Sequence, residues 1–405
     1  MNTKAAASGS STSTYHGDSA IFFAAVGAHL RRYRVDIASG AFTLLDTTIL
    51  PSPVQYAWQH RSREFWYIAT SSRGPDGSGL DHDDGKIHHE LSAYRVDPVT
   101  GALSAHGEPA PLPYRPIHLS LDRSSTHALV AFPNPVHLLV RKINADGSVG
   151  ELVKHDGPVE VGVYPHQVRV TPDNDLAILV ARGHQQHCDV IIPGEFDVFK
   201  YRDGKLSDRA VVSALGGNNF GPRHIDFHPT QPWLYTSLEA QHNLCMFRLE
   251  PGRVSSEPAY VISTLARPDR VHDRQMTSTL HVHPNGRFVY VSERVHSVDE
   301  TQATFPGEDT VVAFAIDQKT GEPTFLQRVQ LIGRHPRTFA IEASGRLMVV
   351  ANKSPVLVAD GRGSRIVPAD LESFHIGEDG KLTAASKLDI DVGIASIFWS
   401  GFADV

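Results

Sequence analysis

Cationic and titratable side chains stand at matching positions in several similar segments of this chain. The clearest segments, each read as a strand, a turn and a second strand, begin at Pro165, Pro222, Thr277 and Pro336. In each segment the two strands are antiparallel. The second residue of the segment and the residue at the end of its second strand therefore lie at the same end of the strand pair. These two positions hold His166, Arg182, Arg223, Glu239, Arg294, Arg337 and Lys353. On a chain of net charge −7, such a gathering of cations favours the binding of a small anionic ligand.

The elements that would position these side chains follow from the spacing of the segments. Weaker copies begin at Pro53 and Pro116, and the six starts are 63, 49, 57, 55 and 59 residues apart. A lone first strand lies near Ile394, and residues 21–27 (IFFAAVG) resemble the second strand that it lacks. A turn of the type DxxTGxL gives an independent count, because it follows a strand seven times. Its glycines are Gly40, Gly101, Gly147, Gly204, Gly252, Gly321 and Gly380.

Each unit therefore carries two hairpins, which together make one four-stranded antiparallel blade. Seven such units predict an all-β, seven-bladed β-propeller in which N-terminal and C-terminal strands together close one blade. A β-helix, the alternative repetitive β-fold, has a far shorter repeat. We expect residues 1–18 to form a flexible polar tail and residues 19–405 to form a single propeller domain.

Composition limits the classes of partner. The chain has 38 Lys and Arg against 45 Asp and Glu, so a broad basic face for nucleic acid or a membrane surface is not expected. No stretch approaches the ~20 apolar residues of a membrane helix, and the first residues lack the apolar core of a secretory signal. We therefore expect a cytoplasmic protein, and a monomer.

Its two cysteines, Cys188 and Cys245, are expected to be buried thiols.

Long connections between second and third strands are expected at the end of the propeller that carries the cations, where loops commonly bind ligands. They span residues 71–90, 183–195, 295–309 and 354–370.

Three groups of residues resemble metal ligands, but each pattern is incomplete. His281 and His283 alternate along a strand without an identified third ligand. The group His184, His187 and Cys188 lacks a zinc motif, and residues 81–85 (DHDDG) fail the spacing of a calcium loop. We therefore predict no metal and no cofactor.

The segments resemble the seven-bladed propeller lactonases, a family that includes bacterial 6-phosphogluconolactonase and fungal 3-carboxy-cis,cis-muconate cyclase. The similarity covers about residues 20–402. It rests on PHQVRVTPD with His166, GPRHIDFHP from Gly221, LYTSLE ending at Glu239, HPNGRFVYVSER ending at Arg294, and HPRTFAIEASGRLMVVANK from His335. The resemblance implies that His166, Arg223, Glu239 and Arg294 are the catalytic residues. Glu293 is a departure, because the family commonly has Asn before the last arginine.

The expected reaction is the metal-independent hydrolysis of an anionic sugar lactone, 6-phosphogluconolactone or a related compound. His166 is the candidate general base, since an unperturbed histidine pKa of ~6.5 suits neutral conditions. Arg223 and Arg294 are candidates to hold the carbonyl oxygen or a substrate anion. The surrounding cations should lower the pKa of Glu239, which favours an orienting role. Arg337, Lys353 and Arg182 are candidates to bind a phosphate or a second carboxylate.

Two other functions stay open. A cycloisomerase that closes a carboxylated muconate into a lactone would use the same cations on carboxylates, with Glu239 or His166 as the proton donor. A propeller that serves only as a protein-binding platform is a third interpretation. The absence of the WD and GH signatures from the sequence argues against it.

Overall fold

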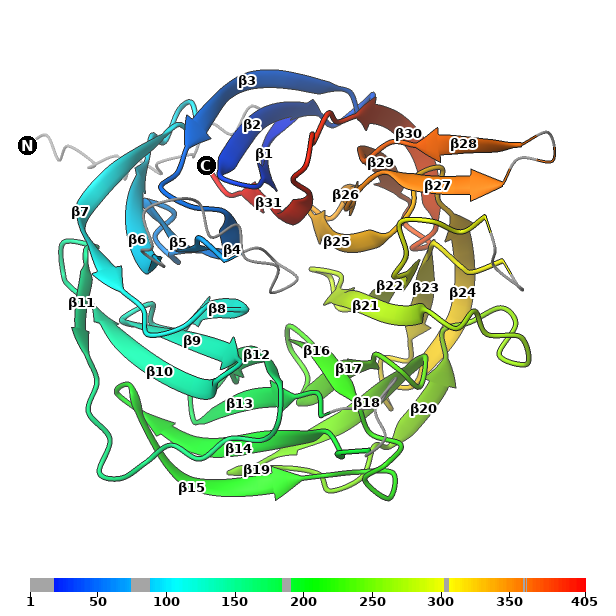
Figure 1. Cartoon of the computed structure of the whole chain (residues 1–405). Helices are drawn as coiled ribbons and strands as arrows, with labels where there is room; N and C mark the ends of the chain where they lie inside the picture. Colours follow the sequence, from blue (N-terminus) through cyan, green and yellow to red (C-terminus); the bar gives the residue numbers. More distant parts are fainter. Residues whose placement is uncertain (1–17, 74–87, 184–190, 302–305, 360, 362) are drawn as a thin grey trace, which may run out of the picture.

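Short antiparallel strands arranged around a central channel make up the protein (Figure 1). The computed structural model describes residues 18–73, 88–183, 191–301, 306–359, 361 and 363–405. Strands pair into seven four-stranded blades, and the prediction of a seven-bladed propeller is confirmed. Within the described ranges, no helix is long and apolar enough to cross a membrane.

Each blade runs from an innermost strand at the channel to an outermost strand at the edge of the ring. The blade that closes the ring consists of β31 (Ile397–Ala403), β1 (Ser19–Val26), β2 (His29–Asp36) and β3 (Phe42–Ile49). The next two are β4 (Val54–Gln59), β5 (Phe65–Ser71), β6 (His89–Val96) and β7 (Leu103–Pro111), then β8 (His118–Leu121), β9 (His127–Pro133), β10 (Val136–Ile143) and β11 (Val149–Leu152). The fourth is β12 (Pro165–Val170), β13 (Leu176–Ala181), β14 (Glu195–Arg202) and β15 (Lys205–Val212).

The remaining three blades complete the ring. The fifth is β16 (Pro222–Phe227), β17 (Trp233–Leu238) and β18 (Asn243–Glu250), with an outer edge divided between β19 (Arg253–Val254) and β20 (Tyr260–Ser263). The sixth is β21 (Gln275–Val282), β22 (Phe288–Val295), β23 (Thr310–Ile316) and β24 (Pro323–Gln330). The seventh is β25 (Pro336–Ile341), β26 (Leu347–Asn352), β29 (Asp370–Ile376) and β30 (Leu382–Asp389).

The predicted closure by the two ends of the chain is confirmed in detail. β1 pairs with β31 in antiparallel register, so that Phe22 lies opposite Phe402 and Ala24 lies opposite Ser400. The predicted tail, residues 1–18, lies outside the described residues except for Asp18.

The seven predicted glycine turns join the third and fourth strands of the blades, and every one of these glycines has a positive φ. Gly147 shows why a side chain is excluded, because an added Cβ would collide with the ring of Phe65 in the preceding blade. The Gly147 carbonyl also accepts a 2.8 Å hydrogen bond from the Tyr67 hydroxyl. This turn therefore joins two blades as well as two strands.

The apolar core lies between the faces of adjacent blades. In one cluster, Val180 and Phe196 of the fourth blade pack with Ile225 and Phe247 of the fifth, and all four are fully buried. Burial of this kind holds the inner strands in fixed positions around the channel.

The four long connections leave the ends of β5, β13, β22 and β26, as predicted. The last carries an unpredicted hairpin of β27 (Val356–Ala359) and β28 (Ser364–Val367), which projects from the ring in Figure 1. Residues 74–87, 184–190 and 302–305 of the other three lie outside the described residues.

Candidate functional site

A cavity of about 440 Å³ occupies the end of the channel at which the innermost strands begin. All seven residues singled out from the sequence line it: His166, Arg182, Arg223, Glu239, Arg294, Arg337 and Lys353. They come from four consecutive blades. The sequence alignment of the segments therefore predicted correctly that these side chains share one opening.

Glu239 is the centre of the charged cluster. Its Oε1 accepts hydrogen bonds from Arg223 Nε at 2.9 Å and Arg294 Nη2 at 3.2 Å, while Oε2 pairs with Arg182 Nη1. Arg223, Glu239 and Arg294 are each at most 4% exposed. One carboxylate thus holds three guanidinium groups from three neighbouring blades in fixed positions.

Backbone hydrogen bonds also hold Glu239 in place. Its N–H donates to Gly221 O at 2.9 Å, and its own carbonyl accepts from Thr277 N of the next blade, also at 2.9 Å. The residue directly follows β17, so it stands where the second strand of one blade meets the first strand of the next. This location allows it to reach arginines on both sides.

The pKa values of the cluster reflect a local excess of positive charge. Burial alone would raise the pKa of Glu239, yet Arg182, Arg223 and Arg294 hold it at about 2, the direction predicted from the sequence. Burial and the neighbouring Arg294 lower the pKa of Arg223 to about 9. The pKa of Arg337 is also lowered, by burial and by Arg223 and Arg294. A bound anion would relieve this repulsion.

Other cations surround the cluster and are placed by aromatic rings. The Arg337 guanidinium lies 3.8 Å from the centre of the Phe398 ring, and Arg115 lies 5.7 Å from the same ring. Arg182 lies 4.2 Å over Tyr164. With Arg73 and Lys353, seven arginine and lysine residues among those that the structure describes line the cavity, against one described carboxylate, that of Glu239.

His166, the first residue after the start of β12, lies in the wall of this cavity. Its side chain is buried, and Nδ1 has no hydrogen-bond partner among the described residues. Burial, followed by Arg223 and other nearby cations, lowers its pKa well below 6.5. The expectation of an unperturbed pKa was therefore wrong, and the imidazole is neutral throughout the neutral range.

Arg294 has a second partner that the sequence analysis did not identify. Its Nη1 donates to Nε2 of His335 at 2.7 Å, which requires a neutral imidazole. Burial and the charge of Arg294 lower the pKa of His335 well below 6.5. The His335 backbone N–H in turn donates to Asp309 Oδ1 at 2.9 Å. Arg294 is thus held between Glu239 on one side and His335 on the other.

The sequence alignment also missed lining residues one position before the segment starts. Arg115, Tyr164 and Met276 occupy that position and line the cavity. Arg73 and His296 lie a few residues beyond the end of the second strand and line it as well. Extending the comparison by one residue upstream and three downstream would have found these side chains.

Glu293, the departure from the family pattern, does not line the cavity. It is fully buried and accepts hydrogen bonds from Thr264 Oγ1 at 2.6 Å, Thr277 Oγ1 at 2.5 Å and Gln275 Nε2 at 3.0 Å. Its role is to anchor the chain at the entry to β21.

Among the possible metal ligands, His283 links two blades, because its Nε2 forms a 2.8 Å hydrogen bond with Gly345 O. His184, His187, Cys188 and residues 81–85 lie outside the described residues. In the part of the chain that the structure describes, no three His, Cys, Asp or Glu side chains are grouped to hold a metal ion. Cys245 is a buried thiol whose pKa burial raises to about 12.

Comparison with known proteins gives a consistent picture. A family model described as "Lactonase, 7-bladed beta-propeller" matches residues 12–359. The chain is 26% identical over 291 residues to a 6-phosphogluconolactonase of Bacillus subtilis, covering 71% of this chain and 76% of that protein. It is 24% identical over 341 residues to a 6-phosphogluconolactonase of Cronobacter sakazakii, covering 84% and 90%.

Solved structures show the same architecture. The periplasmic gluconolactonase of Pseudomonas aeruginosa superposes with a TM-score of 0.71 at 20% identity, over 96% of this chain and 99% of that one. At this identity the likeness concerns the fold.

Proposed function

Because this chain belongs to the lactonase family of seven-bladed β-propellers, we propose that it hydrolyses a lactone that carries a negative charge, such as 6-phosphogluconolactone or a related sugar-acid lactone. One observation carries the proposal. In the described part of the chain, the cavity that holds a neutral histidine is lined by seven arginine and lysine residues and one carboxylate. A site with this charge binds a small anion and stabilises negative charge that develops on it.

The proposed reaction uses His166 as the general base. It removes a proton from water while the water oxygen attacks the lactone carbonyl carbon, and the carbonyl oxygen becomes negatively charged. Arg223 and Arg294 stabilise this oxygen. The ring C–O bond then breaks, and the proton held by His166 passes to the departing alkoxide oxygen. The product is the open-chain hydroxy acid.

Glu239 positions the arginines in this scheme. With a pKa of about 2 it is ionised at neutral pH and has no proton to donate. Its three ion pairs keep the guanidinium groups in place before substrate arrives, so little reorganisation is needed in the transition state. Arg337, Lys353 and Arg73, which also line the cavity, are the proposed contacts for the substrate's phosphate or carboxylate.

The cycloisomerase alternative is less well supported. Ring closure of a carboxylated muconate needs a proton donor, and both groups considered for this task are poor acids near neutral pH, Glu239 because it is ionised and His166 because a neutral imidazole does not readily give up its remaining N–H proton. A purely protein-binding role leaves the buried charged cluster unexplained, since protein interfaces are depleted of charge at their centre.

The reaction can be assigned by presenting both substrate classes to the same preparation. Hydrolysis of 6-phosphogluconolactone and gluconolactone releases acid that a pH-stat records, whereas cyclisation of carboxymuconate removes a diene chromophore. We expect acid release by the wild type and a loss of about 10²- to 10³-fold in Arg223→Ala. The exposed Lys142→Ala, whose side chain pairs with Glu151 on the outer part of a blade, is the control. Diene consumption without lactone hydrolysis would overturn the proposal.

A further inference from the structure

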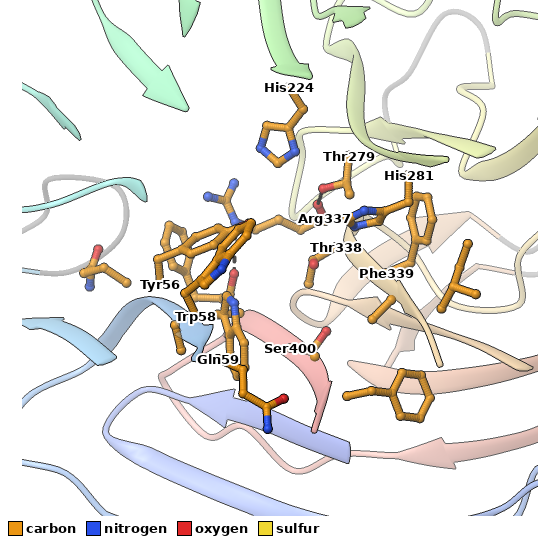
Figure 2. Close-up of a pocket in the computed structure, with 18 of the residues that line it drawn as sticks. Tyr56, Trp58, Gln59, His224, Thr279, His281, Arg337, Thr338, Phe339 and Ser400 are labelled. Carbon is orange, nitrogen blue, oxygen red and sulfur yellow. Dashed lines mark hydrogen bonds between the residues drawn. The ribbon is translucent and has the colours of Figure 1, made fainter. Parts of the chain in front are cut away.

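A second cavity, of about 380 Å³, lies towards the opposite end of the channel, where the innermost strands end. It is formed mainly by β4, β21, β25 and β31 (Figure 2). Ile117, His166, Arg223, Arg337 and Phe398 line both cavities and form the boundary between them. The proposed hydrolysis gives no role to the remaining residues of this second cavity, which we call the aromatic cavity.

One wall of the aromatic cavity is a fixed aromatic surface. The rings of Tyr56 and Trp58 are stacked, with centres 6.5 Å apart and an interplanar angle of 21°. Behind them, Tyr56 packs at 4.1 Å on the buried ring of His118, and the Arg169 guanidinium lies 4.8 Å from the Trp58 ring. Both Tyr56 and Trp58 stay partly exposed. Packing from behind leaves them open towards the cavity.

The opposite side carries polar groups beside apolar ones. Figure 2 shows Thr338 and Phe339 across the cavity from Tyr56 and Trp58, with His281 beside them. His281 Nδ1 lies 3.6 Å from Asp226 Oδ2, and its ring meets Phe339 edge-on at 5.0 Å. Asp226 and Phe339 thus fix the orientation of the imidazole.

Several polar atoms of this cavity lack partners among the described residues. Ser400 is 5% exposed, and its Oγ is buried without a hydrogen bond. Trp66 Nε1 and Gln55 Oε1, from two other residues that line this cavity, are also buried without a hydrogen bond. Buried polar groups without partners are costly, so a ligand that supplies hydrogen bonds would be stabilised here.

The charge of the aromatic cavity differs from that of the first. Apart from the shared Arg223 and Arg337, its lining includes one carboxylate, that of Asp404, and no other arginine or lysine among the described residues. Burial and neighbouring cations lower the pKa of His224 well below 6.5, which keeps that imidazole neutral. Apart from the two shared arginines and Asp404, the described walls therefore present rings, hydroxyls, amides and imidazoles, of which that of His224 is neutral.

We propose that the aromatic cavity binds an uncharged, hydroxylated ring of monosaccharide size. The apolar face of such a ring packs on Tyr56 and Trp58, and its hydroxyls hydrogen bond with His224, His281 and Ser400. The volume lies at the lower end of the ~300 to 1,000 Å³ typical of small-molecule sites. This inference does not depend on the proposed lactone hydrolysis, because it rests on residues that hydrolysis does not use.

Intrinsic fluorescence provides a direct test on the wild-type protein. Trp58, Trp66 and Trp399 line the aromatic cavity, and the chain has four tryptophans in all. Titration with methyl β-D-glucopyranoside, a neutral pyranoside that cannot open or hydrolyse as a lactone, should change the emission saturably at millimolar concentrations. The absence of a saturable change, together with no saturation-transfer signal on the glycoside protons by NMR, would overturn the proposal.

Two variants locate the binding, with calorimetry as the readout. Trp58→Ala removes half of the stacking surface and should weaken glycoside binding about tenfold. Lys353→Ala, which changes only the first cavity, should leave it unchanged. The opposite pattern, in which Lys353→Ala weakens binding and folded Trp58→Ala does not, would place the glycoside in the first cavity and contradict the inference.

Discussion

The two cavities of the channel have similar volumes, about 440 and 380 Å³, and share five lining residues, yet their chemistry differs. The first is lined by residues at the starts of inner strands and just beyond the ends of second strands. The aromatic cavity is lined by residues farther along the inner strands β4, β25 and β31. Strand β25 contributes to both, with Arg337 near its start and Phe339 in its middle.

The difference shows how position along a strand determines side-chain chemistry in this fold. Where strands begin and end, residues of neighbouring blades converge, so Glu239 can pair with arginines from three blades at once. In the middle of the inner strands, hydrogen bonding to the second strand fixes the backbone. The side chains there face the channel alone or stack along their own strand, as Tyr56 and Trp58 do.

The largest difference between the two cavities is expected for two histidines that are neighbours in space. His166 and His224 are both buried and neutral, with ring centres 5.1 Å apart, but only His166 lines the first cavity. Steady-state kinetics should show that His166→Ala lowers kcat by about 10²- to 10⁴-fold, the usual contribution of a general base. His224→Gln should lower it by less than about tenfold. Equal losses in the two variants would remove His166 from its catalytic role.

Carboxylates of the two cavities should contribute unequally to stability. Glu239→Gln leaves three arginines without their shared partner, and loss of one member of a buried ion pair destabilises by about 3 to 5 kcal/mol. Asp404→Asn should change the free energy of unfolding by less than about 1 kcal/mol, because no described residue hydrogen bonds to that carboxylate. Urea unfolding measures both. A Glu239→Gln protein as stable as the wild type would contradict the structural role of the cluster.

Salt concentration should affect ligand binding in the two cavities differently, and this effect should be smaller than those of the substitutions. Raising NaCl from about 50 to 300 mM should increase KM for a charged lactone several-fold, because counterions screen the cationic cavity. Binding of methyl β-D-glucopyranoside should change little over the same range. A KM that does not respond to salt would argue that the cations do not bind the substrate.

The pH dependence should be the smallest effect. Since the pKa of His166 is lowered well below 6.5, the base stays deprotonated as pH falls from 8 to 6, and activity is lost only below that range. Glu239, with its pKa of about 2, also stays ionised. With a carboxylated lactone, which does not itself titrate in this range, kcat/KM should vary by less than about twofold after subtraction of spontaneous hydrolysis. A midpoint near 6.5 would show that His166 is unperturbed.

Much of the fold was predictable because it repeats. The segment spacing and the seven glycine turns each gave the blade count, and the rim residues followed from aligned positions. The hairpin β27–β28 has no counterpart in the described parts of the other blades, so the repeat carried no signal for it. The aligned position also fails at β21, where Met276 lines the cavity and Ser278 does not.

The rest of the site depends on contacts between distant segments. Burial lowers the pKa of His166, followed by Arg223 and His224, which lie 57 and 58 residues away in the sequence. The aromatic cavity joins β4 to β25 and β31, which are separated by most of the chain. No periodicity of the sequence indicates which side chains face each other across a channel.

The central claim is that the cationic cavity selects and hydrolyses a negatively charged lactone. The most direct test is the ratio of kcat/KM for 6-phosphogluconolactone to kcat/KM for gluconolactone, measured on one preparation. Two charge-assisted hydrogen bonds of about 1.5 kcal/mol each predict a ratio of about 100 or more. A ratio near one, or faster turnover of the uncharged lactone, would contradict the account.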